Sequence, residues 1–190
     1  MRTFRLAIAA LLIASCAAAP KLVGTEIEPT AAPDFTLTDG ISGVPFSLSA
    51  QLGSVVVLSF LYTHCPDVCP LTAETMRQAQ EKLSADERSH TLFVAVSADP
   101  IHDTPQAVQA FARDHRLATR FVFLVGGAAQ LQPVWSAWGI RIETDPTATG
   151  VGHSDAVYLL DKKGRVRLLT HSDITPEALA GDVRLLAAER

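Results

Sequence analysis

Residues 54–61 read Ser-Val-Val-Val-Leu-Ser-Phe-Leu, an almost continuous apolar run that is rich in β-branched side chains. A run of this length and composition is typical of a central strand that is covered on both faces. Residues 62–70 follow directly and read Tyr-Thr-His-Cys-Pro-Asp-Val-Cys-Pro, with Pro70 placed to open a helix. The sequence therefore predicts that Cys65 and Cys69 stand where a buried strand ends and a helix begins.

Strand and helix signals alternate along the rest of the chain. Strands are predicted over residues 91–97, 120–125, 156–160 and 165–169, and helices over residues 70–83, over 104–115 and from Thr175 onward. The stretch 128–138 also has a helical pattern, but its Pro133 predicts one helix starting near that proline or two short ones. This order predicts an α/β domain with a mixed central sheet flanked by helices on both faces.

Length and charge limit the classes of function. The chain has 190 residues, enough for one domain with one substantial core, and its formal net charge is −4. Lysines and arginines do not gather into the basic face that phosphate backbones require, so nucleic-acid binding is not expected.

Residues 1–15 are predicted to be a signal peptide of the lipoprotein type. Two arginines lie at its start, and an apolar stretch spans residues 6–14. That stretch is too short to cross a bilayer, which takes about 20 apolar residues. Residues 13–16, Ile-Ala-Ser-Cys, look like a bacterial lipobox, in which Cys16 would be diacylated and become the first residue after cleavage. Ordinary cleavage near residues 17–19 is the alternative, and it would leave a protein without a lipid anchor.

Residues 16–32 are predicted to form the lipid anchor and a flexible tether, because they are Ala-rich, contain two prolines and show no apolar period. The folded domain is expected over residues 33–190. If Cys16 is lipidated, the chain keeps an even number of free thiols, namely the pair Cys65 and Cys69. The expected location is the periplasmic side of a bacterial membrane, where the pair closes as a disulfide unless a metal or a reductant holds it open.

The predicted strand–helix junction favours thiolates, because backbone N–H groups and the helix dipole favour negative charge there. A thiolate is both the nucleophile of disulfide exchange and a metal ligand, so the junction fits both functions. Three residues separate Cys65 from Cys69, whereas dithiol oxidoreductases typically have two, and Pro70 is expected to keep Cys69 out of regular helix. This wider, loop-borne pair suits a soft ion with a third ligand opposite. Two thiolates and an imidazole suit Cu(I), and sulfur with nitrogen also suits Cu(II) or zinc.

Six histidines are candidates for the third ligand: His64, His90, His102, His115, His153 and His171. His64 adjoins Cys65, but neighbouring side chains usually point apart. His153 follows a Gly-containing turn and precedes the strand predicted over residues 156–160. In a thioredoxin-like layout the loop before that strand lies over the reactive cysteines. Position alone leaves two interpretations of His153 open, a metal ligand and an ordinary hydrogen-bonded histidine.

Three segments occur in order along the chain: Tyr-Thr-His-Cys-Pro-Asp-Val-Cys-Pro at 62–70, Val-Ser-Ala-Asp-Pro-Ile-His-Asp-Thr-Pro at 96–105 and Gly-His-Ser-Asp-Ala-Val-Tyr-Leu-Leu at 152–160. Together they resemble the SCO/SenC family of copper-binding, cytochrome oxidase assembly proteins. The resemblance covers about residues 33–190.

The resemblance implies a thioredoxin-like domain that binds one copper ion, as Cu(I) or Cu(II), through Cys65, Cys69 and His153. It also implies a metallochaperone that hands copper to, or reduces the cysteines of, the binuclear copper centre of cytochrome c oxidase subunit II. The family often has a transmembrane anchor, which the lipobox replaces here. His153 stands in Gly-His-Ser-Asp rather than the commoner Asp-His-Thr.

Three aspartates near these motifs have ordinary explanations. Asp155 either orients the His153 ring or lies in a solvated turn, and the turn is the preferred interpretation. Asp99 and Asp103 lie in a loop where turn formation and helix capping account for both, although a role at the site is the alternative.

Two other functions remain open for the same residues. Cys65 and Cys69 are the redox pair if the protein is an enzyme, namely a thiol–disulfide oxidoreductase acting on periplasmic proteins. A copper or redox sensor that signals to another periplasmic copper or thiol partner is the second. A peroxidase is less well supported, because the sequence shows no single activated cysteine beside a threonine and an arginine.

Overall fold

The computed structural model describes residues 21–117, 119–144 and 151–189. The predicted signal peptide and Cys16 lie outside the described residues. In the part of the chain that is described, no helix is both long and apolar enough to cross a membrane.

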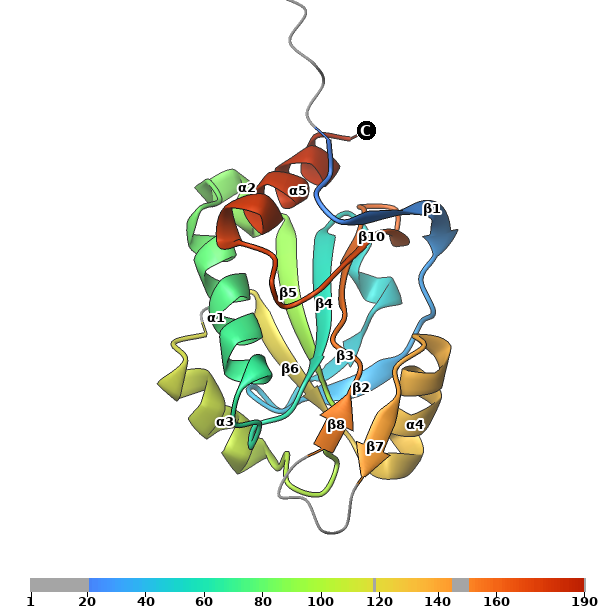
Figure 1. Cartoon of the computed structure of the whole chain (residues 1–190), viewed down its shortest axis with the longest axis vertical. Helices are drawn as coiled ribbons and strands as arrows, with labels where there is room; N and C mark the ends of the chain where they lie inside the picture. Colours follow the sequence, from blue (N-terminus) through green and yellow to red (C-terminus); the bar gives the residue numbers. More distant parts are fainter. Residues whose placement is uncertain (1–20, 118, 145–150, 190) are drawn as a thin grey trace, which may run out of the picture.

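A mixed sheet of eight strands forms the centre of the domain, in the order β1-β10-β9-β4-β5-β6-β2-β3 (Figure 1). Its strands are β1 (Thr25–Ala31), β2 (Thr36–Asp39), β3 (Pro45–Ser47), β4 (Val55–Leu61), β5 (Thr91–Ser97), β6 (Phe121–Val125), β9 (Val157–Leu160) and β10 (Arg165–Thr170). Strands β4, β5 and β6 are parallel, and the other pairings are antiparallel. A separate hairpin pairs β7 (Ile142–Thr144) with β8 (Val151–His153).

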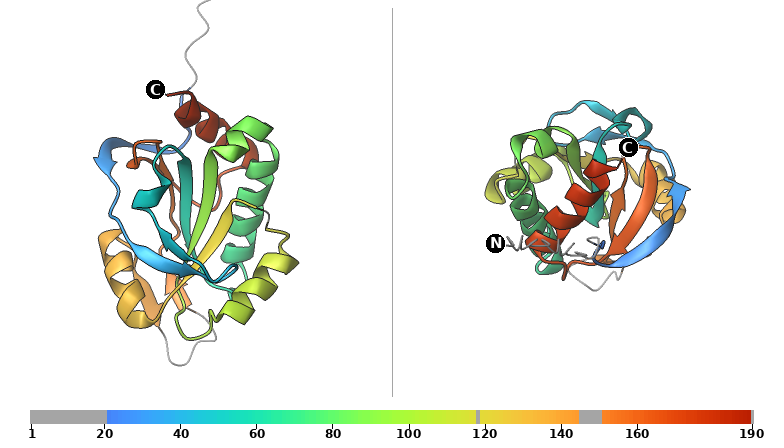
Figure 2. Two further views of the ribbon diagram at one scale, coloured as in Figure 1. Left: turned by 180° about the vertical axis from the view of Figure 1, so that it is seen from behind. Right: turned by 90° about the horizontal axis from the view of Figure 1, so that it is seen from above.

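Helices cover both faces of the sheet, as predicted. Helices α1 (Val68–Glu81), α3 (Pro105–Asp114) and α5 (Pro176–Ala188) pack on one face, and α4 (Ala128–Ala137) packs on the other (Figure 2). Every residue of β4 is buried. Val55 and Val57 belong to the core beneath α1 and α5, whereas Val56 and Leu58 belong to the core beneath α4. Burial on both sides explains why this strand is an unbroken apolar run.

Two helices differ from their predicted limits. Helix α1 begins at Val68, so Cys69 lies in the first helical turn and not in a loop as predicted. Pro70 is tolerated there because the first N–H groups of a helix have no intrahelical acceptor. Helix α4 runs through Pro133 as a single helix, anchored by buried residues on either side of the proline, Leu131 and Val134.

A short helix, α2 (Ala85–Ser89), was not predicted. Its start carries a capping box, in which the Ser84 side chain accepts from the Glu87 N–H and the Glu87 side chain accepts from the Ser84 N–H. This Ser-x-x-Glu signal is visible in the sequence, although the helix is short.

The prediction that residues 16–32 form a flexible tether is wrong for residues 25–31. Residues 25–31 form β1, which pairs antiparallel with β10, and the folded domain therefore starts before Pro33. Most side chains of β1 are exposed, and this edge strand is held mainly by backbone hydrogen bonds. The sequence of residues 25–31 therefore shows no apolar period that could have revealed a strand.

Asp182 of α5 fixes the chain just before β1. Its Oδ1 accepts a hydrogen bond from the Val23 N–H at 2.8 Å, and its side chain is almost fully buried. Its Oδ2 is buried without a hydrogen-bond partner among the described residues. Burial raises the pKa of Asp182 to about 6, against the lowering effect of the Val23 bond and with the Glu26 carboxylate adding to the rise.

We expect Asp182→Asn to flatten the pH dependence of stability. The folded-state pKa of Asp182 lies above its unfolded value of about 4. Its protonated form is therefore favoured by folding, and this contribution is present below about pH 4 and lost as the pH rises through about 6. Urea unfolding midpoints across this range measure it. The exposed Asp173→Asn control should keep the wild-type slope, and an unchanged slope in Asp182→Asn would contradict the prediction.

Candidate metal centre

The candidate site lies at the end of the sheet where the parallel strands β4 and β5 finish. The loop after β4, the start of α1 and the β7–β8 hairpin meet there (Figure 1). Cys65 lies in that loop, Cys69 in the first turn of α1 and His153 at the end of β8. Carboxyl ends of parallel strands are the usual location of sites in such sheets.

Cys69 and His153 are in direct contact although 84 residues separate them. The Cys69 Sγ lies 3.6 Å from the His153 Nε2. Cys69 is fully buried and His153 is half-buried. The Ile142–His153 pairing of the β7–β8 hairpin holds His153 over α1.

The backbone selects the tautomer of His153. Its Nδ1 lies 3.0 Å from the carbonyl oxygen of Ser154, which can only accept a hydrogen bond. In the neutral ring the hydrogen therefore sits on Nδ1, and Nε2 carries the lone pair that faces Cys69. This is the arrangement by which a metal-binding histidine is usually oriented.

The two thiols have opposite environments. Burial acts to raise the pKa of the half-buried Cys65. Hydrogen bonds from the Cys69 thiol, the N–H groups of Asp67 and Cys69 and the Tyr62 hydroxyl outweigh burial and lower it. The Cys69 N–H lies 3.3 Å from the Cys65 Sγ. Burial, followed by the hydrogen bond to Cys65, strongly raises the pKa of Cys69. Cys65 is therefore the thiol that ionises first.

The residues present fit a sulfur- and nitrogen-bound ion. With metal–sulfur and metal–nitrogen bonds of about 2.3 and 2.0 Å and angles near 110–120°, two such ligands of one ion lie about 3.5–3.7 Å apart. The Cys69–His153 separation of 3.6 Å matches this spacing. Across residues 21–117, 119–144 and 151–189, no three metal-binding side chains are already grouped closely enough to hold an ion. The Cys69–His153 pair is therefore the part of a candidate site that is already at ligand spacing.

Tyr62 forms a wall of the site that the sequence analysis did not identify. It is buried, and its ring meets the His153 ring edge-on at a centroid distance of 5.7 Å. Burial, together with the hydrogen bond to Cys65, raises the pKa of Tyr62 to about 12. Its position directly after a buried strand and three residues before Cys65 was the available signal.

Asp103 positions the loop that carries Cys65, which is a role at the site and not the capping or turn role preferred from sequence. Its Oδ1 accepts hydrogen bonds from the N–H and the hydroxyl of Thr63, both at 2.8 Å. Its Oδ2 accepts from the Ser97 hydroxyl at 2.6 Å. Burial raises the pKa of Asp103 despite these bonds. The carboxylate therefore joins the Cys65 loop to the end of β5.

The other two aspartates behave as the preferred interpretation predicted. Asp99 accepts hydrogen bonds from the N–H groups of Ile101 and His102, which forms the turn after β5. The exposed Asp155 accepts from the N–H and hydroxyl of Ser172. The His153 ring is held by a carbonyl, so Asp155 is not needed to orient it.

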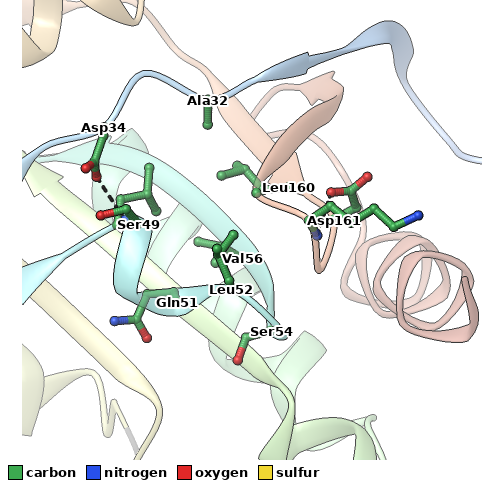
Figure 3. Close-up of a pocket in the computed structure, with 12 residues that line it drawn as sticks. Ala32, Asp34, Ser49, Gln51, Leu52, Ser54, Val56, Leu160 and Asp161 are labelled. Atoms are coloured by element: carbon green, nitrogen blue, oxygen red, sulfur yellow. Dashed lines mark hydrogen bonds between the residues drawn. The ribbon is translucent and has the colours of Figure 1, made fainter. Parts of the chain in front are cut away.

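A cavity of about 110 Å³ lies at the opposite end of β4 (Figure 3). Asp34, Leu52 and Asp161 are among its lining residues, and the Asp34 carboxylate accepts from the Ser49 N–H at 2.9 Å. The lining contains neither a thiol nor an imidazole. The candidate metal centre is therefore separate from this cavity.

The SCO1/SenC family profile matches residues 24–188. Protein SenC of Rhodobacter capsulatus is 31% identical over 156 residues, which are 74% of this chain and 68% of that protein. The chain spans 61% of a relative from Stutzerimonas stutzeri that is 33% identical over 126 residues, which are 65% of this chain.

Solved structures share the fold. Apo Sco1 from Thermus thermophilus has a TM-score of 0.77 and 27% identity, and the match covers 90% of this chain and 99% of that one. ScoI of Bradyrhizobium japonicum, solved with copper bound, has a TM-score of 0.69 and 26% identity, over 83% of this chain and 99% of that one. The predicted thioredoxin-like architecture is confirmed.

We expect iodoacetamide to alkylate Cys65 at least about tenfold faster than Cys69 in the reduced, folded chain near neutral pH. Cys65 is half-buried with a lowered pKa, whereas Cys69 is fully buried with a raised one. Peptide mapping by mass spectrometry over time gives both rates. The difference between the two alkylation rates should disappear in denaturant. Equal rates in the folded chain would contradict the different burial and pKa of the two thiols.

Proposed function

Because the chain belongs to the SCO1/SenC family, we propose that it binds one copper ion, as Cu(I) or Cu(II), between Cys65, Cys69 and His153. The observation that carries the proposal is the Cys69–His153 pair, whose 3.6 Å separation fits two ligands of one ion. The family's copper-bound ScoI structure supports the choice of metal. Soft thiolates with one imidazole favour Cu(I) among the first-row ions.

The graded exposure of the three ligands suits transfer by ligand exchange. Cys65 is half-buried in a loop, His153 is half-buried and Cys69 is fully buried. Ligands of an acceptor therefore reach Cys65 before Cys69. Both thiols bind as thiolates, so affinity falls at low pH, and a Cys65–Cys69 disulfide abolishes binding.

The acceptor in this proposal is the binuclear copper centre of cytochrome c oxidase subunit II, which the protein loads with copper or whose cysteines it reduces. The three motifs that resemble SCO/SenC proteins and the family match support this assignment. Another periplasmic copper or thiol protein is the alternative partner.

One observation favours a second candidate, a thiol–disulfide oxidoreductase. Cys65 combines partial exposure with a lowered pKa, and the buried Cys69 lies beside it with a raised pKa. An exposed attacking thiolate backed by a buried resolving thiol is the arrangement that disulfide exchange requires. His153 is not needed for this chemistry.

The anchor belongs to the same proposal. Cys16 is lipidated after cleavage of residues 1–15, which holds the domain on the periplasmic side of a bacterial membrane. The start of the described chain and the C-terminal end of α5 lie at the opposite end of the molecule from the β7–β8 hairpin (Figure 1). A chain attached at its N-terminus therefore presents the metal centre away from the point of attachment.

Copper titration tests the three-ligand centre. We expect the reduced chain to bind one Cu(I) tightly in competition with a Cu(I) chelator, and His153→Ala and Cys69→Ala each to weaken binding by at least about tenfold. His171→Ala is the matched control, because that exposed ring hydrogen-bonds the Asp155 carbonyl outside the centre. Wild-type affinity in His153→Ala would overturn the copper proposal.

A disulfide-exchange assay on His153→Ala and on a further variant, Cys65→Ser, separates the two candidates. An oxidoreductase keeps its exchange rate in His153→Ala and loses it in Cys65→Ser. Loss of copper binding with full exchange activity in His153→Ala would show that the two functions share the thiols and differ in their need for the imidazole.

The lipid anchor has its own test. In a bacterial host that processes lipoproteins, we expect the mature chain to begin at residue 16 and to carry the mass of the acyl groups, and Cys16→Ser to lose this mass and leave the membrane fraction. Intact mass spectrometry and membrane fractionation measure both. Cleavage near residues 17–19 in the wild type would contradict the prediction.

A further inference from the structure

We propose that His64 and His102 form a second cation site on the surface beside Cys65, which takes a borderline divalent ion such as Cu(II) through two imidazole nitrogens. This inference does not depend on the thiols, and it goes beyond the proposed three-ligand centre.

The two rings come from different loops and meet at the surface. His64 follows β4 and His102 follows β5, and their ring centroids lie 5.6 Å apart with an interplanar angle of 64°. With a metal–nitrogen bond of about 2.0 Å and a ring radius of about 1.2 Å, two imidazoles on one ion have centroids about 5.2 Å apart at a tetrahedral angle and about 4.5 Å apart at the 90° angle of tetragonal Cu(II). The observed pair therefore needs to close by about 1 Å or less. Both side chains are exposed, so small ring rotations meet little resistance.

Hydrogen bonds fix the tautomer of His64. The Thr63 hydroxyl has a single hydrogen, which it donates to the Asp103 carboxylate at 2.8 Å. The same hydroxyl lies 3.0 Å from the His64 Nδ1, and it can only accept there. The hydrogen of the neutral His64 ring therefore sits on Nδ1, which leaves the lone pair on Nε2.

A carboxylate fixes His102 in the same way. The His102 Nδ1 lies 2.6 Å from the Asp99 Oδ2, and the Asp99 side chain is buried. The Nδ1–H donates to this carboxylate, and Nε2 is again the free nitrogen. Carboxylate–histidine pairs of this kind hold the orientation of a metal-binding ring. Asp99 thus contacts the His102 ring directly, and Asp103 is linked to the His64 ring through the Thr63 hydroxyl.

The chemistry of the ligands defines the ion. Two imidazoles without a thiolate suit Cu(II) or Zn(II) better than Cu(I), and Cu(II) binds more tightly in the usual order of divalent ions. Two protein ligands leave coordination positions open to water or to an incoming donor. His64 lies in the same loop after β4 as Cys65, so the pair of rings is placed to serve as a capture site near the thiols.

The test removes the three-ligand centre first. The full-length chain carrying Cys65→Ser, Cys69→Ser and His153→Gln is titrated with Cu(II), followed by calorimetry and electron paramagnetic resonance. We expect one Cu(II) per chain with hyperfine structure from two nitrogens. Adding His64→Gln or His102→Gln should each weaken binding by at least about tenfold.

The controls use the same chain that carries Cys65→Ser, Cys69→Ser and His153→Gln as their background. Adding His90→Gln, which changes an exposed histidine after α2, should leave Cu(II) affinity unchanged, and circular dichroism checks that each variant is folded. Cu(II) binding that is absent from the background, or that His64→Gln and His102→Gln leave intact, overturns the second site. Failure of Cu(I) binding by the wild-type thiols would refute the proposed function without affecting this result, because the background lacks those thiols.

Discussion

The hydrogen bonds of one buried carboxylate, Asp103, hold together the end of the molecule that carries the candidate site. They join the Thr63 loop to the Ser97 end of β5, and both connections are short. Each buried donor that lost this acceptor would cost about 1–3 kcal/mol. The position of Cys65, the orientation of His64 and the spacing between the two loops all depend on it.

The difference between the two thiols arises from where the main chain changes from strand to helix. Strand β4 is buried throughout. The loop that follows it lies nearer the surface, and α1 then packs back onto the sheet. Cys65 lies in this loop and accepts a hydrogen bond from the Cys69 N–H, whereas Cys69 lies in the first turn of α1 and is fully buried. One short segment thereby gives two chemically identical groups opposite tendencies to ionise.

Much of this arrangement was predictable from sequence, because the decisive signals were local. The apolar run of β4, the caps at Thr104 and Thr175 and the hairpin of β9 and β10 are patterns within a few residues. The pairing of β1 with β10 was not predictable, because an exposed edge strand carries no apolar alternation. The start of α1 was missed because proline was assumed to begin a helix, although it fits equally well later in the first turn.

The residues of the candidate site also divide into those that the sequence predicted and those that it did not. Cys65 and Cys69 stood out from their position after a buried strand. The position of His153 before another strand left two interpretations open, and the resemblance to the SCO/SenC family pointed to it as a ligand. Tyr62 and Asp103 act through contacts with residues distant in the fold, and only the structure shows them. The role of Asp103 depends on a hydroxyl 40 residues earlier in the chain, a relation that no spacing pattern encodes.

The pairing of β1 at the sheet edge also determines how the domain bears mechanical load. A pull on the chain near Lys21 acts first on the Val23–Asp182 hydrogen bond and then along the β1–β10 ladder. Strand β9 lies between that ladder and β4, whose far end leads to Cys65. Tension from the N-terminus is thus taken up by an edge strand that two other strands separate from β4, which shields the geometry around the thiols from it.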